Sequence, residues 1–421
     1  MPRPSTRPAL HLAALLAALA AGLATPPARA ETSPWWLGAS ANVTHESNLY
    51  RLADTAQALP PGRQASDTVA QGVLMGGLDQ PFGRQRLTAD ATVRQARFAN
   101  NRMLDYGGHD LRLALAWATV ERLSGDVVLK SGREFVGFGS DQITGGRLDR
   151  SLLGTRSAEA NFRLGLVTRW SAELGASTLR GDYSAAADDW RDRSATQLRA
   201  GLRFRPHDLL SLGLGLRTVR TEYPRYAVDS GGNARAEQQR ARFADLDGHW
   251  SPSGNSRLEG RLSLGRTRFE QFALQDSSGA SGQLAWHWAP TGKMRLALRW
   301  ARERGEDLQR PDGAGLVADS SRRSDVLGLT WNQELTTKLA LQAGWRETRR
   351  DLVDDRSLGG LRAVRYGDDS TRLWQLGLRW APTRSVDLSC DWTSERRRAT
   401  GGLSSPFDAR TLGCQAQMVM R

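Results

Sequence analysis

Large apolar residues recur at every second position over many short segments of this chain. From Leu111 to Trp117 the leucines and the tryptophan share one parity, and arginine and alanines share the other. The same alternation is found in Leu210–Arg217, Met294–Trp300 and Leu373–Trp380. Successive side chains of a β-strand point to opposite faces, whereas an amphipathic helix repeats its apolar residues at spacings of three and four. The pattern predicts strands with one large apolar face and one face of Gly, Ala, Ser, Gln and Arg.

This rule divides the chain after its first thirty residues into about eighteen predicted strands, an even number. The predicted strands are residues 35–44, 68–79, 84–97, 108–121, 124–135, 152–166, 170–183, 190–204, 208–222, 237–250, 256–270, 279–288, 293–305, 322–334, 337–350, 370–380, 385–397 and 407–420. In a soluble sandwich the large face would pack on a second sheet. Here the opposite face carries arginine in strand after strand, which favours a wet, wide lumen.

The connections between these segments alternate in length. The short ones are residues 80–83, 122–124, 167–169, 205–207, 251–255, 289–292, 335–336 and 381–384. Between them lie longer polar ones, such as residues 50–67, 139–150, 224–236, 306–321 and 351–369. Outer-membrane barrels have tight periplasmic turns and long outer loops, and an even strand number puts both termini in the periplasm.

Tryptophan followed by proline marks several of the predicted short turns. The sequences Trp250-Ser251-Pro252, Trp288-Ala289-Pro290 and Trp380-Ala381-Pro382 each close a predicted strand. Indole favours the membrane–water interface, because it is apolar and has one hydrogen-bond donor. Proline beyond the last ladder residue ends a strand without removing a needed hydrogen bond. The placement therefore indicates an aromatic girdle at the turn end of a barrel.

The first thirty residues have the features of an export signal. Arg3 and Arg7 precede an Ala- and Leu-rich run, and Ala28-Arg29-Ala30 gives the small-x-small pattern that signal peptidase accepts. We expect residues 1–30 to be a cleaved signal peptide and residues 31–421 to form one outer-membrane β-barrel domain. An uncleaved anchor is the alternative, although the apolar run is short for a bilayer span.

The positive charge of the chain restricts the partners that it could have. The formal net charge is +13, and loss of Arg3, Arg7 and Arg29 with the leader would leave about +10. Export makes nucleic acid an unsuitable partner, whereas anionic solutes and anionic lipid remain.

Arginines on the inward parity form the candidate functional set. This predicted basic track of the lumen consists of Arg94, Arg112, Arg163, Arg199, Arg203, Arg217, Arg261, Arg295, Arg299, Arg346 and Arg379. Inward acids accompany them, such as Asp90, Glu173, Asp245, Asp247 and Glu259. One interpretation is a solvated wall in which arginines pair with acids. The other is a track that lowers the entry barrier for an anion, because charged rings set pore selectivity and guanidinium binds carboxylate through two donors.

Cys390 and Cys414 are the two cysteines, and both fall on the outward parity of the last predicted hairpin. If that hairpin turns around Gly401-Gly402, the cysteines lie opposite each other, close enough for a cross-strand disulfide. Paired free thiols are the alternative. The chain ends in Met420-Arg421 and lacks the C-terminal aromatic residue that closes many such barrels.

No motif of a known catalytic or metal site is present. The sequence contains neither H-E-x-x-H nor G-x-S-x-G, and its six histidines form no cluster with metal-ligand spacing. We therefore expect no enzymatic activity, no metal and no cofactor.

After the first predicted strand, His45 is followed by Glu46-Ser47-Asn48-Leu49-Tyr50-Arg51-Leu52. This segment resembles the Asp-Ser-Asn-Leu-Phe-Arg-Leu motif of the EpsL-like outer-membrane β-barrels of exopolysaccharide-biosynthesis operons, within the broader group of β-barrel porins. Glu46 replaces the aspartate and Tyr50 the phenylalanine. A cysteine pair in the last hairpin is also similar to that family. The resemblance implies a role in secreting or assembling a polysaccharide.

Together these observations predict an all-β protein, a transmembrane antiparallel β-barrel of the bacterial outer membrane. The predicted function is a pore in exopolysaccharide biosynthesis or export, with lumen arginines that favour an anionic polymer or solute. The expected partners are outer-membrane lipid, an acidic exopolysaccharide and periplasmic export components. A general diffusion porin and a non-conducting barrel that anchors a synthesis complex are the alternatives.

Overall fold

The computed structural model describes residues 33–53, 59–138, 148–165, 169–228, 233–271, 276–304, 321–358 and 361–420. The predicted signal peptide, residues 1–30, lies outside the described residues.

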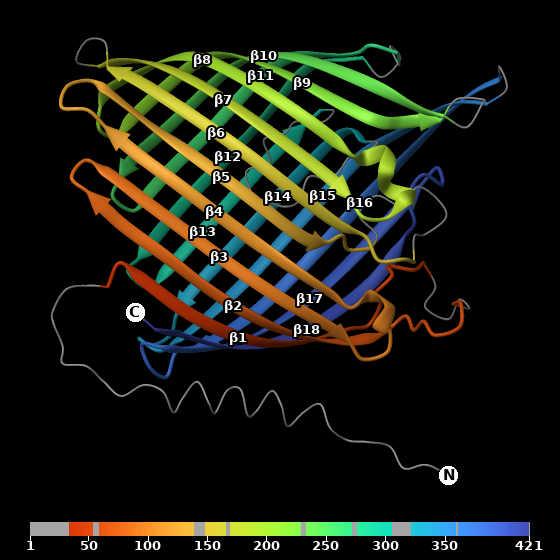
Figure 1. The fold of residues 1–421 in the computed structure, drawn as a ribbon. Coiled ribbons are helices and arrows are strands. Elements are labelled where there is room, and N and C mark those ends of the chain that lie inside the picture. The colour runs from red at the N-terminus through yellow and green to blue at the C-terminus, as the bar shows by residue number, and fades with distance from the viewer. Residues whose placement is uncertain are drawn as a thin grey trace.

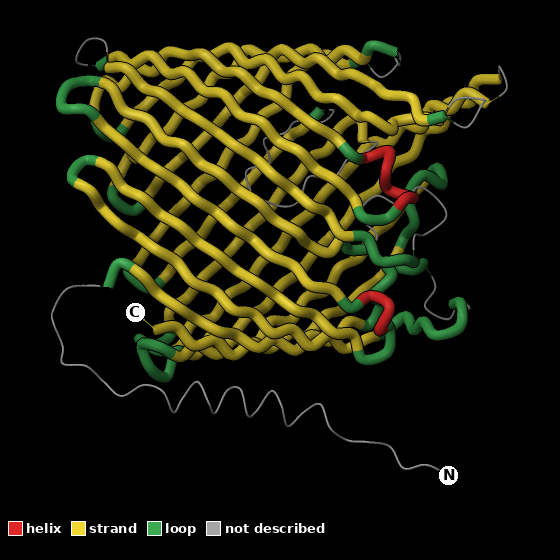
Figure 2. The backbone as a smooth tube through the Cα atoms, in the orientation of Figure 1, coloured by secondary structure: helices red, strands yellow, loops and turns green. Residues whose placement is uncertain are grey.

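The described residues form one closed sheet of eighteen antiparallel strands, seen from the side in Figure 1. The strands are β1 (Trp35–Glu46), β2 (Asp67–Phe82), β3 (Gln85–Phe98), β4 (Tyr106–Ala118), β5 (Leu123–Phe135), β6 (Leu152–Gly165), β7 (Trp170–Tyr183), β8 (Arg193–His207), β9 (Leu210–Val228), β10 (Ala234–Ser253), β11 (Ser256–Phe269), β12 (Ser277–Thr291), β13 (Met294–Glu303), β14 (Ser321–Glu334), β15 (Leu339–Leu358), β16 (Leu361–Trp380), β17 (Val386–Thr400) and β18 (Phe407–Met420). Two 3-10 helices, η1 (Arg102–Leu104) and η2 (Ala186–Arg191), lie at the barrel end away from the C-terminus (Figure 2).

The first and last strands close the barrel. β1 pairs with β18 from Leu37 opposite Met420 to Glu46 opposite Thr411, and its other edge pairs with β2. Every strand therefore has two neighbours, so no edge is left open to pair with another chain. Closure also satisfies the backbone hydrogen bonds, as a chain that crosses a bilayer requires. The fold class and strand number predicted from the alternation are confirmed.

The outer face of the barrel is a continuous apolar belt. On β9, Leu214 and Leu216 are 64% and 69% exposed, and the outward residues of β11 are similar, with Leu264 at 57%. Exposed tryptophans, including Trp250 and Trp380, lie at one end of this belt. Exposing so large an apolar surface to water would be energetically unfavourable, whereas contact with the hydrocarbon of a bilayer is favourable. The outward face is therefore the lipid-facing face.

The tight connections lie at the end of the barrel where the chain begins and finishes. β2 and β3 are joined through Gly83-Arg84, and Gly83 has a φ of +60°, which a glycine adopts without strain. Trp35 pairs with Leu78 close to this turn, so the start of β1 lies at the same end. Short turns of outer-membrane barrels are periplasmic, and this end is therefore the periplasmic end.

The prediction that Trp250 and Trp288 end their strands was wrong by three residues in each case. β10 continues to Ser253 and β12 to Thr291, and the register shifts between Trp250 and Ser253 and between Trp288 and Thr291. Proline has no N–H for the ladder, so the pairing skips it and resumes beyond it. The tryptophans still mark the end of the regular ladder.

Two predicted outer loops are largely strand. β15 and β16 pair as far as Leu358 opposite Leu361, where residues 351–369 were expected to form a loop. β9 and β10 likewise extend into the predicted loop 224–236, with a register shift between Arg235 and Glu237. These ends project beyond the neighbouring strands, outside the lipid, so nothing imposes the apolar alternation used to find strands. The predicted start at residue 190 is also wrong, because η2 occupies Ala186–Arg191.

A disulfide joins the last two strands. Cys390 on β17 lies directly opposite Cys414 on β18, with 4.1 Å between their Cα atoms. Both side chains share the outward face with Trp392 and Leu412. The bond therefore links the last hairpin covalently, within the strand pair that β1 must meet to close the barrel.

Among the described residues, no helix has both the length and the hydropathy to cross a membrane.

Candidate functional site: the charged lumen wall and its outer end

The eleven predicted arginines all lie on the face opposite the apolar belt. Arg94 follows Val93, which is 56% exposed on the outside, and Arg217 follows Leu216. The others alternate in the same way with lipid-facing neighbours along their strands. Because a closed barrel has only two faces, these arginines line the lumen.

Most of these arginines are paired with a carboxylate. The ion pairs are Arg94–Asp110, Arg112–Asp90, Arg163–Glu173, Arg203–Glu173, Arg203–Asp247, Arg217–Asp245, Arg295–Glu334 and Arg379–Asp387. Arg261 interacts electrostatically with Asp245. Arg199, Arg299 and Arg346 have no ion pair or hydrogen bond within the described part of the chain. The wall is therefore a mixed surface of donors and acceptors, with three unpaired guanidinium groups.

Glu173 is the centre of a network that crosses several strands. Its Oε1 lies 3.1 Å from Arg163 Nε and 2.7 Å from Arg203 Nε. Arg203 also reaches Asp247 Oδ2 at 2.9 Å and donates to Ser211 Oγ at 3.1 Å. Two acids and two arginines of β6, β7, β8 and β10 thus hold one another in fixed positions on the wall.

Gly213 on β9 makes the Arg203–Asp247 contact possible. It pairs with Arg203 on one side and Asp247 on the other, so the ion pair passes over it. A Cβ atom at this position would lie 2.7 Å from Asp247 Oδ1. Any larger residue would push the carboxylate away. Because this glycine has no side chain, Arg203 of β8 and Asp247 of β10 can contact each other across β9.

A second pair is buried in the wall nearby. Arg217 and Asp245 are 2.9 Å apart, and their side chains are only 1% and 6% exposed. Asp245 also accepts a hydrogen bond from Ser263 Oγ at 2.6 Å, and the Arg217 guanidinium lies 4.1 Å from the Phe243 ring centroid. A buried charge without a partner is costly, so this pair holds β9, β10 and β11 together and is not accessible to a passing solute.

Several partner acids are additional to the examples named from the sequence. Asp110, Glu334 and Asp387 were not among those examples, although each pairs with a predicted arginine. Glu334 and Asp387 stand at or next to a strand end, where the alternation is too short to assign a face. Parity alone also gives no pairing partner, because that depends on the register between strands.

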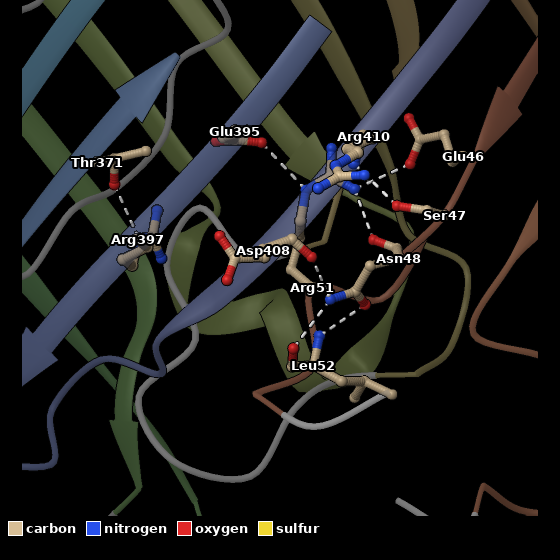
Figure 3. Close-up of polar contacts among 10 residues, drawn as sticks. All are labelled: Glu46, Ser47, Asn48, Arg51, Leu52, Thr371, Glu395, Arg397, Asp408 and Arg410. Carbon is tan, nitrogen blue, oxygen red and sulfur yellow. Dashed lines mark hydrogen bonds and ion pairs between the residues drawn. The ribbon is translucent and has the colours of Figure 1, made fainter. Parts of the chain in front are cut away.

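The family-like segment Glu46–Leu52 clasps the outer end of the barrel seam (Figure 3). Arg51 Nη1 lies 2.9 Å from Glu46 Oε2, and its Nε lies 3.1 Å from Glu395 Oε2 on β17. Burial alone would lower the pKa of the Arg51 guanidinium, but these two carboxylates outweigh it and raise that pKa. Arg51 has a φ of +54°, a backbone conformation that costs a non-glycine residue about 1 kcal/mol. The two ion pairs explain why the strain is maintained.

Asn48 and Ser47 attach the same segment to β18. Asn48, 1% exposed, donates to the carbonyl oxygens of Leu52 and Asp408, both at 2.9 Å. Its Oδ1 accepts a hydrogen bond from the Leu52 N–H at 2.9 Å. Ser47 exchanges hydrogen bonds with the backbone of Arg410, also shown in Figure 3. Residues about 360 positions apart in the chain are joined where the first and last strands meet.

Leu49 and Tyr50 anchor the clasp in an apolar cluster with Phe98, Leu104 and Phe138. The Tyr50 hydroxyl donates to Asn101 Oδ1 at 2.8 Å, and its ring centroid lies 4.6 Å from that of Phe138. Burial raises the pKa of the Tyr50 phenol, and Arg63 opposes this increase. The resemblance thus marks a structural clasp at the outer rim, and every member of the motif from Glu46 to Leu52 belongs to it.

Next to the clasp, a group of charged residues lies on the inward side of the last strands. Arg350 Nη2 lies 2.6 Å from Asp369 Oδ2, and the Asp369 side chain is fully buried. Arg397 is 4.0 Å from the same oxygen and donates to Thr371 Oγ1 at 3.0 Å (Figure 3). The guanidinium groups of Arg397 and Arg51 lie 4.9 and 5.7 Å from the centroid of the Phe407 ring. Sequence parity gives the inward face of Arg350 and Arg397, but their burial was not foreseen.

A cavity of about 240 Å³ adjoins the clasp on the lumen side and is lined by Asn42, Thr44, Glu46, Arg51 and Gln71, among others. Within the described ranges, no group of His, Cys, Asp or Glu has the arrangement to hold a metal ion.

Comparison with solved structures finds proteins of similar fold. Pseudomonas aeruginosa OccK2 (OpdF) is similar over 92% of this chain and 98% of its own, at 14% identity and a TM-score of 0.50. P. aeruginosa OccK3 (OpdO) matches over 92% and 96% of the two chains, at 12% identity and a TM-score of 0.48. P. aeruginosa OccK5 (OpdH) matches over 92% and 98%, at 13% identity and a TM-score of 0.47. No protein-family model and no curated protein matches the sequence.

The likeness to OccK2 is a likeness of fold. Together with the closed barrel, the lipid-facing belt and the even strand number, it identifies an outer-membrane β-barrel. The predicted location in the bacterial outer membrane is confirmed at this level.

Proposed function

We propose that this protein is an outer-membrane channel that conducts an anionic hydrophilic solute, and that this solute is an acidic exopolysaccharide. The proposal includes that residues 1–30 are a leader that directs the export of this chain, and that the barrel associates with periplasmic export components. The observation that carries it is the contrast between an apolar outer face and a lumen face lined with arginine.

The width of the barrel supports the channel. Barrels of sixteen to eighteen strands enclose an aqueous space too wide for wall side chains to fill, and this one has eighteen. Paired charges on the wall keep that space polar. Alternating guanidinium and carboxylate groups offer both donors and acceptors, which suits a polymer rich in hydroxyl groups.

The three unpaired guanidinium groups support the preference for an anion. Arg299 on β13 and Arg346 on β15 lie in one row on either side of Gly328 of β14, and Arg199 lies on β8, in another part of the wall. A guanidinium without a carboxylate partner has its donors available to a passing carboxylate. Within the predicted basic track, these three arginines contact the solute. The paired arginines maintain the shape and polarity of the wall.

The polysaccharide is supported by the resemblance of Glu46–Leu52 to the EpsL-like barrels. In this chain the segment is a clasp at the outer rim, beside the cavity at the mouth of the lumen. A rim held in one conformation keeps the mouth open for a polymer.

Conductance of the full chain in planar bilayers tests the proposal. The wild type is expected to conduct and to prefer anions, and an acidic oligosaccharide is expected to block it at a lower concentration than a neutral one of equal length. The variant R199Q/R299Q/R346Q should lose most of the preference, by about threefold in the anion-to-cation permeability ratio.

The matched control is R349Q/R372Q/R396Q, which removes three arginines from the outward face, where Glu347 and Asp408 pair with them. Its selectivity should equal that of the wild type. A barrel that does not conduct would contradict the channel and favour a structural anchor. Conductance without anion preference or block would leave a general diffusion porin.

A further inference from the structure

The outer face of β9, β10 and β11 carries a dense patch of arginines above the apolar belt. Arg220, Arg240 and Arg268 lie directly opposite one another in one row across the three strands. Arg242 and Arg266 are opposite each other in the next row. All five alternate with lumen-facing residues and are exposed on the outward face. We call these five residues the outer arginine patch.

The position of the patch relative to the lipid follows from the strand geometry. Along β10, Arg242 is eight residues from Trp250 and Arg240 is ten, which is about 27 and 34 Å at a rise of 3.4 Å per residue. With a strand tilt of about 40°, these distances become about 21 and 26 Å across the bilayer. The apolar band of such barrels is about 25 Å tall. Because Trp250 marks the periplasmic interface, the patch lies at the interface of the outer leaflet.

The charges of the patch are largely uncompensated by the protein. Arg220 is paired with Glu222 at 2.9 Å, and Arg240 donates to the neutral Gln238 at 2.7 Å. Arg242, Arg266 and Arg268 have no ion pair and no hydrogen bond in the part of the chain that is described. The nearby carboxyl of Asp276 accepts the backbone N–H of Phe269.

Like charges directly opposite each other on a sheet are destabilising. Facing arginines elsewhere on this rim have acids beside them. Asp325 lies opposite Arg302 and Arg349, and in the row Glu347, Arg372, Arg396, Asp408 across β15–β18 each of the two facing arginines is paired with an acid. On β9–β11 no such acid intervenes between facing arginines. An anion from outside the chain would remove this repulsion.

Apolar rows continue directly below the patch. Leu216 and Leu264 form the next row, and Leu246 and Leu262, 50% and 48% exposed, form the row after it. A ligand at this position therefore meets guanidinium groups at one level and a leucine surface toward the membrane centre. A lipid with an anionic headgroup and acyl chains has this distribution, whereas a free anion has no apolar part that would contact the leucines.

We infer that the outer arginine patch binds the phosphate groups of a phosphorylated lipid of the outer leaflet, whose acyl chains lie along the leucine rows of β9–β11. Guanidinium binds phosphate through two parallel hydrogen bonds, and charge-assisted bonds of this kind are the strong ones. The surface is independent of the lumen, so the inference does not rest on the proposed channel function.

The test measures binding of lipid A to the purified full-length barrel in a neutral detergent, with native mass spectrometry as the readout. The probes are diphosphorylated lipid A, its dephosphorylated form and inorganic phosphate. The wild type should bind diphosphorylated lipid A at least about tenfold more tightly than the dephosphorylated form. Inorganic phosphate at the same concentration should not displace it.

The variant R242Q/R266Q/R268Q should bind diphosphorylated lipid A about tenfold more weakly. The control R349Q/R372Q/R396Q removes the same charge from the same face and rim but from acid-paired positions, and should bind within about twofold of the wild type. If the triple variant does not fold, the double variant R242Q/R266Q provides the same test, with a loss of about fourfold.

Equal losses in the patch and control variants would show a nonspecific effect of net charge and overturn the inference. Unchanged binding in the patch variant, equal affinity for dephosphorylated lipid A, or displacement by inorganic phosphate would each overturn it as well.

Discussion

Replacing Asn48 by alanine should open the clasp at the outer rim while leaving the barrel folded. The side chain makes three hydrogen bonds, two with Leu52 and one with the Asp408 carbonyl on β18. Each is worth about 1 kcal/mol net, and the two carbonyl oxygens would lose their donor in a buried place, so the clasp should weaken by about 3 kcal/mol.

Hydrogen–deuterium exchange measures this local free energy, because exposed segments of a folded protein exchange through local opening. The N–H groups of Ser47 and Leu49 donate to Arg410 and Ala65 and report on the clasp. Their exchange in Asn48→Ala should be roughly a hundredfold faster than in the wild type, the equivalent of about 3 kcal/mol. Strands β4 to β15 should be unchanged.

Asn100→Ala is the matched control. Asn100 is exposed, and its side chain makes no hydrogen bond within the described residues, so its loss should alter exchange by less than about threefold. If exchange of the Ser47 and Leu49 N–H groups is accelerated less than tenfold in Asn48→Ala, or no more than in Asn100→Ala, Asn48 does not hold the clasp closed.

Two further changes test the wall and the last hairpin. Gly213→Ala should push Asp247 away from Arg203 and lower the free energy of unfolding, measured by urea titration in lipid vesicles, by about 1 to 2 kcal/mol. Gly72→Ala, where a Cβ meets nothing within 4 Å, should change it by less than about 0.5 kcal/mol. Equal effects of the two substitutions would contradict the role assigned to Gly213. Removing the disulfide with Cys390→Ala and Cys414→Ala frees a segment spanning 24 positions and should cost about 3 kcal/mol in the same assay, and an unchanged midpoint would show that β17 and β18 gain nothing from the bond.

The alternation of apolar residues was sufficient to predict the strands inside the lipid. There, every second residue must be apolar, and the pattern is as strong on β9 as on β16. Outside the lipid, the outward residues need not be apolar and the alternation is lost. The extensions of β9, β10, β15 and β16 were therefore predicted as loops. The outward arginines at strand ends have the same origin, since they lie beyond the hydrocarbon.

The site was predicted in part. Parity gives the face of a residue such as Arg203, but not its contact with Asp247, which depends on the register of three strands and on the glycine between them. The pairing of Cys390 with Cys414 could be predicted, because the position of the hairpin turn sets the register of the two strands that it joins. Glu395, 344 positions from Arg51, could not be assigned to the clasp before the barrel closed.

Accessibility of spin labels along β4 tests the central claim, that the leucine face meets lipid and the arginine face meets water. Labels are placed one at a time at residues 111 to 116 of a barrel in lipid vesicles that lacks both native cysteines. Labels replacing Leu111, Leu113 and Leu115, whose side chains are 46%, 43% and 39% exposed, should relax with dissolved oxygen and not with a water-soluble nickel chelate. Labels replacing Arg112, Ala114 and Ala116 should show the reverse. A reversed pattern, or no alternation with period two, would contradict the account.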